Sequence, residues 1–482
     1  MSEELIKSVP TGLFIGGQWL ESGDGSRIDV SDPATEEVIA SVASGTVDDA
    51  TLAIDAAFEA GKSLAKTAPR VRAEILRAAF ELIMARKDDI AVIMSREEGK
   101  TRAEALGEVA YAAEFFRWYA EEAPRIMGHF GRAPAGMNNI LVDHVPVGVS
   151  LLITPWNFPA AMATRKIAPA LAAGCTVILK PASATPLTAL LVGQLLQEAG
   201  VPDGVVNVFP SKQSGAISNH ILEDHRFRKV SFTGSTEVGR ILLAKASESI
   251  VNCSMELGGN APVIVLDDAD MDVAIEGSMV AKLRNAGESC VAANRFYVHR
   301  SIKDEFAERF AAEMSKLTVG PGLEEGVDIG PLVDANTRDK VAELVDDSVS
   351  NGARVLTGGK SPEGRGYFYE PTVITDVDPQ AKILRTEIFG PVAPIVAFDD
   401  VDDVIEQAND TEFGLISYVF GSTGRALAVA QRIDSGMVGV NRGLVSDPAG
   451  PFGGMKQSGI GREGSQDGIH EFLEKKYIAV EW

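Results

Sequence analysis

Cys290 and Glu256 are the two residues whose types and surroundings could support covalent chemistry. Cys290 lies in the segment RNAGESCVAANR, where small residues surround a single thiol. A thiol that attacks a carbonyl carbon must react as a thiolate, so its pKa has to fall below about 8.5, and a later step of the reaction needs a base. Glu256, in MELGGN, is a candidate base because burial in an apolar, glycine-rich turn after a predicted strand raises the pKa of a carboxyl group. The alternative is that Cys290, like Cys175 and Cys253, is a small buried hydrophobic residue and that backbone amides hold Glu256.

Two other segments could bind a phosphate or a ribose. FTGSTEVG spaces Gly234 and Gly239 between a predicted strand and a predicted helix, which could bring backbone N–H groups and a helix N-terminus to a phosphate. The segment lacks the GxGxxG pattern, and a tight turn at Gly234 is an equal alternative. In KPASATP, Lys180 ends a predicted strand, so its ammonium group could reach a ribose or a phosphate, or could be exposed to solvent.

Composition and charge narrow the class of protein. The chain has 482 residues, of which 45% are hydrophobic and 23% are charged, as expected for a globular protein of two or three domains. The formal net charge of −23 would repel nucleic acid and anionic membranes, so we expect neither as a partner. No apolar run reaches the ~20 residues of a membrane span, and no signal peptide is apparent. Three cysteines without metal-ligand spacing predict no metal site and favour the reducing cytoplasm.

The order of the predicted elements indicates an α/β fold. Short β-rich runs at 149–154, 176–180, 205–209, 230–232 and 261–266 alternate with helical stretches at 160–173, 186–199 and 237–246. This alternation predicts a parallel sheet covered by helices on both faces, with ligands at the carboxyl ends of the strands. Residues 51–122 have helical periodicity, and a second α/β segment runs from about 258 to 420. The glycine-rich stretch after Asn441 is expected to be an ordered, irregular loop, and residues 475–480 to form an edge strand suited to pairing with another subunit.

Seven short motifs together resemble one known family. PWNFP, KPAS, FTGSTEVG, MELGGN, GESC, EIFGPV and PFGGMKQSGIGREG occur in this order across nearly the whole chain. In this combination the sequence resembles the aldehyde dehydrogenase superfamily. The resemblance implies an α/β fold with a Rossmann-type dinucleotide-binding domain (residues 1–125 and 145–256, with part of 445–466), an α/β catalytic domain (257–444) and a small β oligomerisation arm (126–144 and 467–482). It also implies a homo-oligomer, either a dimer or a tetramer.

The resemblance assigns the catalytic roles. Cys290 would attack the carbon of a small-molecule aldehyde, and Asn157 would donate to the resulting oxyanion together with the backbone N–H of Cys290. Glu256 would deprotonate the water that releases the acid.

The same resemblance implies a nicotinamide cofactor. Lys180 would bind the adenosine ribose, Gly234 and Ser235 would lie near the pyrophosphate, and Glu387 would hold the nicotinamide ribose with Phe389 packing near the ring. The full set expected to contact the cofactor is Trp156, Lys180, Ser183, Gly234, Ser235, Leu257, Glu387 and Phe389.

Ser183 bears on the choice between NAD and NADP. Family members selective for NAD often carry a glutamate here, which repels a 2′-phosphate. Serine removes that repulsion and can donate a hydrogen bond to a phosphate. We therefore predict that NADP is accepted, with NAD use also open.

Two arginines indicate an acidic substrate. Arg165, Arg284 and Ser446 resemble the carboxylate anchor of succinate-semialdehyde dehydrogenases, because guanidinium groups bind carboxylates bidentately. The hypothesis is oxidation of succinate semialdehyde to succinate. Ala292 occupies the position at which some members carry a second cysteine, so no disulfide switch is expected there.

Several alternatives remain open. Both arginines could form structural ion pairs instead. The substrate could be glutarate semialdehyde, since one methylene contributes only ~1–3 kcal/mol of discrimination, or an aromatic aldehyde such as vanillin or benzaldehyde. A cofactor-independent thiol esterase and a non-catalytic structural protein are the alternatives outside this chemistry.

Overall fold

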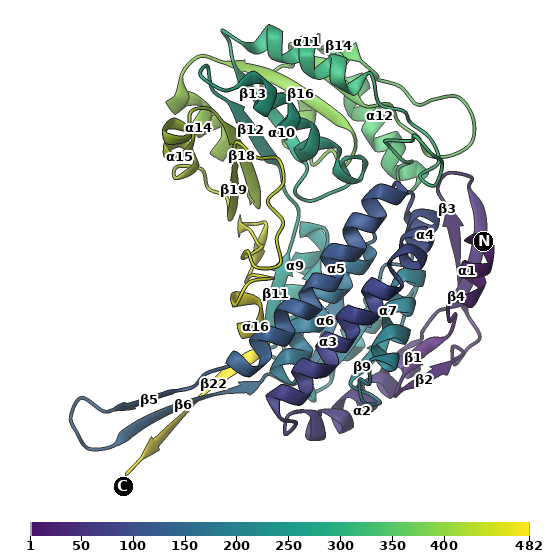
Figure 1. The fold of residues 1–482 in the computed structure, drawn as a ribbon, viewed down its shortest axis with the longest axis vertical. Helices are drawn as coiled ribbons and strands as arrows, with labels where there is room; N and C mark the ends of the chain where they lie inside the picture. Colours follow the sequence, from purple (N-terminus) through teal and green to yellow (C-terminus); the bar gives the residue numbers. More distant parts are fainter. Residues whose placement is uncertain (1, 482) are drawn as a thin grey trace.

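The protein, described from a computed structural model over residues 2–481, contains two large sheets and a projecting arm. Figure 1 shows the two helix-covered sheets as separate lobes, with the arm extending away from them and ending near the C-terminus.

The first sheet has a doubly wound order. Its strands run β2-β1-β9-β8-β7-β10-β11-β21 across the sheet, and β7 to β11 are parallel. Along the chain, β7, β8 and β9 extend the sheet in one direction, whereas β10 and β11 extend it in the other. The order therefore reverses between β7 and β10, and this is where open α/β sheets bind ligands. The strand bounds are β1 (Leu13–Ile15), β2 (Gln18–Leu20), β7 (Val149–Ile153), β8 (Val177–Lys180), β9 (Val206–Val208), β10 (Phe227–Thr233), β11 (Asn252–Glu256) and β21 (Gly459–Ile460).

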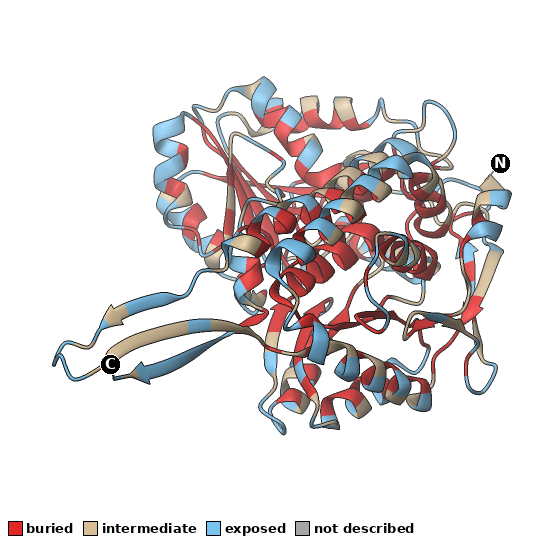
Figure 2. Ribbon diagram, turned by 60° about the horizontal axis from the view of Figure 1, so that its bottom comes forward, coloured by how far each residue is buried: buried red, intermediate tan, exposed pale blue. Residues whose placement is uncertain are grey.

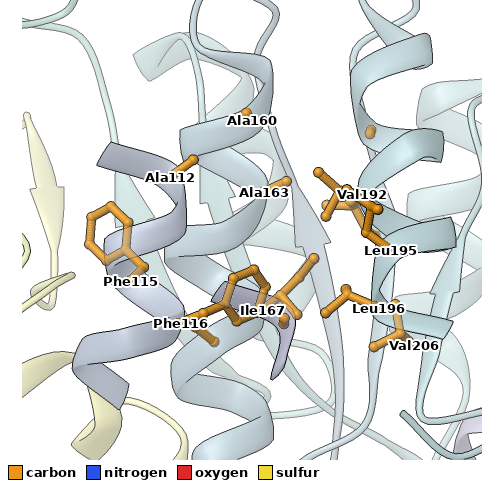
Figure 3. Packing of buried hydrophobic residues seen from close by; sticks show 14 of the residues in the cluster. Ala112, Phe115, Phe116, Ala160, Ala163, Ile167, Val192, Leu195, Leu196 and Val206 are labelled. Carbon is orange, nitrogen blue, oxygen red and sulfur yellow. The ribbon is translucent and has the colours of Figure 1, made fainter. Parts of the chain in front are cut away.

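Helix α6 (Pro159–Ala173) lies at the centre of the first lobe, and all of its residues are buried. Pro159 begins the helix directly after the PWNF segment. At this first helical position the backbone N–H that proline lacks has no partner within the helix. Gly174 ends the helix in a left-handed conformation, with φ 95°. Small residues such as Ala163 allow neighbouring helices to approach closely (Figure 3). The other elements of this lobe are α1 (Ser2–Ser8), β3 (Arg27–Asp32), β4 (Glu37–Ala43), α2 (Val47–Leu64), α3 (Pro69–Ala85), α4 (Lys87–Glu98), α5 (Arg102–Glu122), a 3₁₀ turn η1 (Ala123–Arg125), α7 (Pro186–Glu198), α8 (Ser214–Glu223) and α9 (Thr236–Ala246).

The second sheet faces the site with the amino ends of its strands, whereas the first sheet faces it with carboxyl ends. Its order is β14-β15-β16-β13-β12-β18-β19, parallel except for β14. Gly259 lies two residues before β12, Cys290 precedes β13 and Glu387 precedes β16, so these residues lie toward the amino ends of strands. The elements are β12 (Ala261–Val265), α10 (Met271–Leu283), η2 (Arg284–Gly287), β13 (Ala293–His299), α11 (Lys303–Met314), α12 (Ala335–Ser350), β14 (Arg354–Thr357), β15 (Thr372–Thr375), α13 (Lys382–Arg385), β16 (Val392–Phe398), α14 (Val401–Asn409), β17 (Phe413–Gly414), β18 (Ile416–Phe420), α15 (Thr423–Ala430) and β19 (Met437–Val440).

The glycine-rich stretch is mostly irregular, as predicted, but it contains two short strands. β20 (Met455–Lys456) pairs with β17, and β21 pairs with β11. The stretch therefore crosses from the second lobe to the first and closes over the junction between them.

The arm is a three-stranded antiparallel sheet. It contains β5 (His129–Arg132), β6 (Asn139–Pro146) and the tail strand β22 (Leu473–Val480), which follows α16 (Asp467–His470). The predicted tail strand is confirmed, and inside this chain its partner is β6. Exposed and intermediate residues predominate along the arm, in contrast to the buried interior of both lobes (Figure 2). Among residues 2–481, the helices are all too short or too polar to cross a membrane.

A substitution at Phe116 tests how much the packing of α5 against α6 contributes to the stability of the protein. Its ring is fully buried beside Ile167 of α6 (Figure 3). Phe116→Ala should destabilise the protein by about 3–5 kcal/mol because the neighbouring helices cannot collapse into the cavity. Leu52→Ala, at a side chain that is 50% exposed on α2, is the control and should change stability little. Equal shifts in calorimetric Tm for the two variants would contradict this account.

Candidate active site

A cavity of about 240 Å³ opens at the point where the strand order of the first sheet reverses. It is lined from one side by residues that follow β7, β10 and β11, and from the other by residues that precede β12, β13 and β16. Its walls include most of the residues predicted from the sequence: Trp156, Asn157, Gly234, Ser235, Leu257, Cys290, Glu387 and Phe389.

A second, water-sized cavity of about 10 Å³ lies on the other side of Cys290. Arg165, Arg284 and Ser446, the three residues predicted to bind substrate, all line it, together with Tyr111. Cys290 belongs to the walls of both cavities. The thiol therefore lies between a larger space and a narrow cationic one.

Burial dominates the protonation of Cys290. Desolvation raises the pKa of the thiol to about 12, although the positive charge of Arg165 opposes this. The lowered pKa that a nucleophilic cysteine requires is thus absent from this state, and a base must take the proton. The backbone at Cys290 packs closely against Gly259. A Cβ at position 259 would lie 2.6 Å from the backbone carbonyl oxygen of Cys290, so a glycine is needed there.

Glu256 is the last residue of β11 rather than part of the following turn. Its Oε2 atom is buried and has no hydrogen-bond partner within residues 2–481. Desolvation, followed by repulsion from Glu463, raises the pKa of Glu256 well above its ordinary value, as predicted from its apolar surroundings. A Cβ at Gly453 would lie 2.8 Å from Glu256 Oε1, which shows how closely the glycine-rich loop covers this carboxyl group.

Glu463 is a site residue that the sequence motifs did not single out. Lys166 Nζ donates to Glu463 Oε1 at 2.5 Å and to Ser231 Oγ at 3.0 Å. Arg165 forms an ion pair with the same carboxylate, and its guanidinium stacks 4.2 Å from the Phe452 ring. Burial alone would raise the pKa of Glu463, but the two cations outweigh it and hold that pKa below its ordinary value. Glu463 lies in the GREG motif, and nothing in that motif indicated that Lys166 and Arg165 would be its partners.

The two arginines predicted to bind substrate differ in their partners. The charge of Arg165 is balanced by Glu463, so the structural ion pair considered from the sequence is present at this residue. Arg284 forms no ion pair with any carboxylate of residues 2–481; its guanidinium donates to Ser446 Oγ at 3.4 Å and lies 4.8 Å from the Phe158 ring. Arg284 therefore supplies the uncompensated positive charge of the narrow cavity.

The Asn157 side chain is oriented by a buried hydrogen bond. Its Nδ2 donates to the Glu288 carbonyl oxygen at 2.9 Å, which leaves a second N–H free to donate. The backbone carbonyl oxygen of Asn157 accepts hydrogen bonds from the side chains of Lys100 and Asn285, two residues that sequence reasoning missed. Asn285 lies in the segment RNAGESC, but that segment gave only a weak signal for Asn285, because its interpretation concerned the Cys290 thiol alone.

Groups that suit a nucleotide surround the larger cavity. Ser235 caps α9, accepting from Val238 N at 3.3 Å, so the first N–H groups of that helix lie at the cavity wall. Glu387 accepts a hydrogen bond from Gly259 N at 3.2 Å, and desolvation raises its pKa to about 7. Phe389 adopts a left-handed φ of 58° and makes an edge-on contact with Trp156, with ring centroids 5.6 Å apart.

Lys180 and Ser183 lie outside the lining of this cavity. Lys180 ends β8 with 5% of its surface exposed, and desolvation lowers its pKa to about 8. The Ser183 hydroxyl already donates to the Ser211 carbonyl oxygen at 3.1 Å. The donation to a phosphate predicted for Ser183 therefore requires this bond to open. Their loop is connected to the cavity through Thr185, whose hydroxyl lies 3.4 Å from the Trp156 carbonyl oxygen.

Comparison with known proteins agrees with this geometry. The model of the aldehyde dehydrogenase family matches residues 19–478. The chain belongs to the aldehyde dehydrogenase family. It is 53% identical to a succinate-semialdehyde dehydrogenase of Paenarthrobacter nicotinovorans, over 92% of this chain and 99% of that protein.

Other members are similar over nearly their whole length. The chain is 48% identical to the NADP(+) succinate-semialdehyde dehydrogenase of Escherichia coli K12 and 47% identical to a glutarate-semialdehyde dehydrogenase of Pseudomonas putida, each over 97% of both chains. The crystal structure of an aldehyde dehydrogenase from Brucella melitensis biovar abortus 2308 superposes with a TM-score of 0.97 at 49% identity and covers 98% of both chains. The fold and the enzyme family are thus those predicted from the motifs.

The raised pKa of Cys290 predicts how the thiol reacts in the enzyme without cofactor. Because that pKa is about 12, the thiolate fraction should rise about tenfold per pH unit between about pH 7 and pH 9. The rate of alkylation of the Cys290 peptide by iodoacetamide, followed by mass spectrometry, should rise in the same way. Glutathione, an exposed thiol, is the control and should approach a plateau in this range. A plateau for Cys290 near pH 7 would show that its pKa is low.

Proposed function

We propose that this protein oxidises succinate semialdehyde to succinate with NADP+ or NAD+ as the oxidant. The observation that carries the proposal is the uncompensated charge of Arg284 in the cavity that also contains Cys290. A substrate with a carboxylate at one end and an aldehyde at the other would place its charge at Arg284 and its carbonyl carbon at the thiol. The names of the two succinate-semialdehyde dehydrogenases that resemble this chain support the same substrate.

In this mechanism Cys290 is the nucleophile. Its sulfur forms a bond to the aldehyde carbon, and the thiol proton passes to a base, a role for which we propose Glu256, whose charge acts on the thiol. The carbonyl electron pair moves onto oxygen, where the free N–H of Asn157 Nδ2 and the backbone N–H of Cys290 stabilise it. One such donor typically contributes about 3–4 kcal/mol to transition-state stabilisation.

Release of the acid requires a second base step. After oxidation the acyl group remains on the Cys290 sulfur as a thioester. Glu256 takes a proton from water, the oxygen of that water bonds to the acyl carbon, and the carbon–sulfur bond breaks with the electron pair returning to sulfur. The Glu463–Lys166 pair lies beside Glu256 and offers a route by which the proton can leave the buried carboxyl group.

The residues around the larger cavity fit a dinucleotide. Thr233 Oγ1 lines the cavity, is buried and lacks a hydrogen-bond partner within residues 2–481. The N-terminus of α9 beside it favours an anionic phosphate group. A nicotinamide cofactor bound here supplies the hydride acceptor for the oxidation.

We propose for this cofactor the residue roles that the family resemblance implies. Gly234 and Ser235 would lie at the pyrophosphate, Glu387 at the nicotinamide ribose and Lys180 at the adenosine ribose. Trp156, Leu257 and Phe389 would contact the cofactor by packing, and Ser183 would accommodate a 2′-phosphate because no carboxylate stands at that position to repel it.

Glutarate semialdehyde is the second candidate substrate, supported by the name of the Pseudomonas putida relative. The same two residues, Arg284 and Cys290, would bind either semialdehyde, and one methylene contributes only ~1–3 kcal/mol of discrimination. Aromatic aldehydes would require the arginines to face away from the cavity, and both line it.

The division of labour along the chain is part of the proposal. Residues 1–125 and 145–256, with part of 445–466, would bind the dinucleotide, and residues 257–444 would carry the nucleophile. The arm, 126–144 and 467–482, would join subunits of a dimer or tetramer, because the outer edge of β22 is free to pair. Three free cysteines favour a cytoplasmic location.

The proposed activity is tested by a steady-state screen. Absorbance of NADPH and NADH would be followed with semialdehydes of three, four and five carbons that end in a carboxylate, and with benzaldehyde. We expect the highest kcat/KM for the four-carbon compound and turnover with NADP+. Cys290→Ser is the control and should abolish turnover, because an alcohol is a far weaker nucleophile here. Higher kcat/KM for benzaldehyde would overturn the proposal.

Arg284→Ala separates carboxylate recognition from chemistry. Loss of a charge-assisted contact should raise KM for succinate semialdehyde roughly 10- to 100-fold and leave the kinetics of a neutral aldehyde such as butanal nearly unchanged. Arg442→Ala is the matched control, since it removes a positive charge from the nearby loop but not from the cavity lining. An equal loss for charged and neutral substrates would reject Arg284 as the anchor.

A further inference from the structure

The backbone carbonyl oxygen of Asn157 accepts two hydrogen bonds from buried side chains. Lys100 Nζ donates at 2.8 Å and Asn285 Nδ2 donates at 3.0 Å. Lys100 is 3% exposed and Asn285 is 2% exposed, so water does not compete for these bonds. The peptide group that carries the Asn157 side chain is therefore fixed from behind by residues of two other segments.

Asn285 also connects Asn157 to the segment of the nucleophile. Its Nδ2 lies 3.3 Å from the Glu288 carbonyl oxygen, the same atom that accepts the hydrogen bond from Asn157 Nδ2. Glu288 precedes Cys290 by two residues. One side-chain amide thus contacts the backbone of Asn157 and the acceptor that orients the Asn157 side chain.

The backbone at Asn285 is held in an unusual conformation. Asn285 and Ala286 have left-handed φ angles of 56° and 52°. Asparagine tolerates this region better than most residues, whereas alanine does so at a cost. The Asn285 N–H donates to Glu104 Oε1 at 2.6 Å, and its Nδ2 donates to Glu98 Oε1 at 2.7 Å. These two carboxyl groups keep the turn in place, and strain of this kind commonly marks functional segments.

Lys100 is itself anchored to the start of α6. Its Nζ donates to Glu108 Oε2 at 2.5 Å, and Glu108 Oε1 accepts from the backbone N–H groups of Ala160 and Ala161 at 2.9 and 3.1 Å. Asn157 is therefore held between the first turn of α6 on one side and Asn285 on the other.

We propose that Asn285 is a positioning residue that sets the geometry of Asn157 toward the oxyanion and its distance from Cys290. The proposal rests on the role of Asn157 in the proposed function. Stabilisation of an oxyanion depends steeply on the position of its donor, and a shift of a few tenths of an ångström is enough to weaken it. Asn285 would act entirely through Asn157 and would touch neither substrate nor cofactor.

Asn285→Gly isolates the side-chain amide. Glycine retains the left-handed backbone while the amide is lost, and Glu98 keeps its hydrogen bond from Lys100 N at 3.0 Å. We expect kcat and kcat/KM for the aldehyde to fall together, roughly 10-fold, with KM unchanged, as for an interaction made in the transition state. Alkylation of Cys290 by iodoacetamide should stay within about twofold, because that reaction develops no oxyanion.

Ala286→Gly is the matched control. It changes the neighbouring left-handed residue to glycine, removes no hydrogen-bonding group and should retain kcat/KM within about twofold. Equal losses in Asn285→Gly and Ala286→Gly would assign the effect to the flexibility of the turn and overturn the proposal.

A double-mutant cycle with Asn157→Ala decides whether Asn285 acts through Asn157. Asn157→Ala alone should lower kcat by about 10²–10³-fold, and adding Asn285→Gly should lower it no further. Multiplication of the two effects would reject the positioning role. Full activity in Asn157→Ala would instead reject the proposed function of Asn157, whereas an impaired Asn157→Ala beside a fully active Asn285→Gly would reject only the inference about Asn285.

Discussion

Removal of water from the junction between the two lobes governs the protonation of every reactive group in the site. Desolvation raises the pKa of Cys290 to about 12 and that of Glu256 well above its ordinary value, so both groups hold their protons more firmly here than in water. Some of the nearby charges form compensated pairs, such as Glu463 with Lys166, whereas Arg284 has no ionic partner among residues 2–481. A thiol with so high a pKa is mostly protonated, so Cys290 becomes a good nucleophile only when its proton is removed. This places proton transfer, rather than a permanently ionised thiol, at the start of the mechanism.

The sheet topology explains why so many distant segments meet at this junction. The first sheet contributes the carboxyl ends of β7, β10 and β11, whereas the second contributes the amino ends of β12, β13 and β16. The glycine-rich loop connects the two through β20 and β21 and brings Gly453 against Glu256. Loops at strand ends can vary without disturbing the sheets. The rigid sheets therefore hold Cys290, Glu256 and Asn157 in fixed relation, while the loop contributes Ser446 and Glu463.

Arg165 and Arg284 show that residue type alone does not define a binding group. Both line the narrow cavity, but Glu463 neutralises Arg165, and Arg284 is contacted by the Ser446 hydroxyl and the Phe158 ring. A partly buried charge without an ionic partner is less well solvated than in water, and the proposed substrate carboxylate would compensate it. Arg165 then contributes to the positive potential at a distance and holds Glu463 beside Glu256. Of the two arginines, only Arg284 therefore keeps a charge available for the proposed substrate carboxylate.

The sequence by itself determined the order of the elements, the fold and the family, and it supplied a set of candidate reactive groups. Alternation of strands and helices predicted the first sheet, and the ordered motifs identified the family as well as Cys290, Glu256 and Asn157. These features are local: they depend on residues close together in the chain. The tertiary structure alone decided which charges are paired, how far burial shifts each pKa and what holds Asn157 in place. Glu463 and Lys166 are 297 residues apart, and Asn285 and Asn157 are 128 apart. No local pattern encodes such contacts, because electrostatic energy depends on distance and solvent exposure in the folded chain.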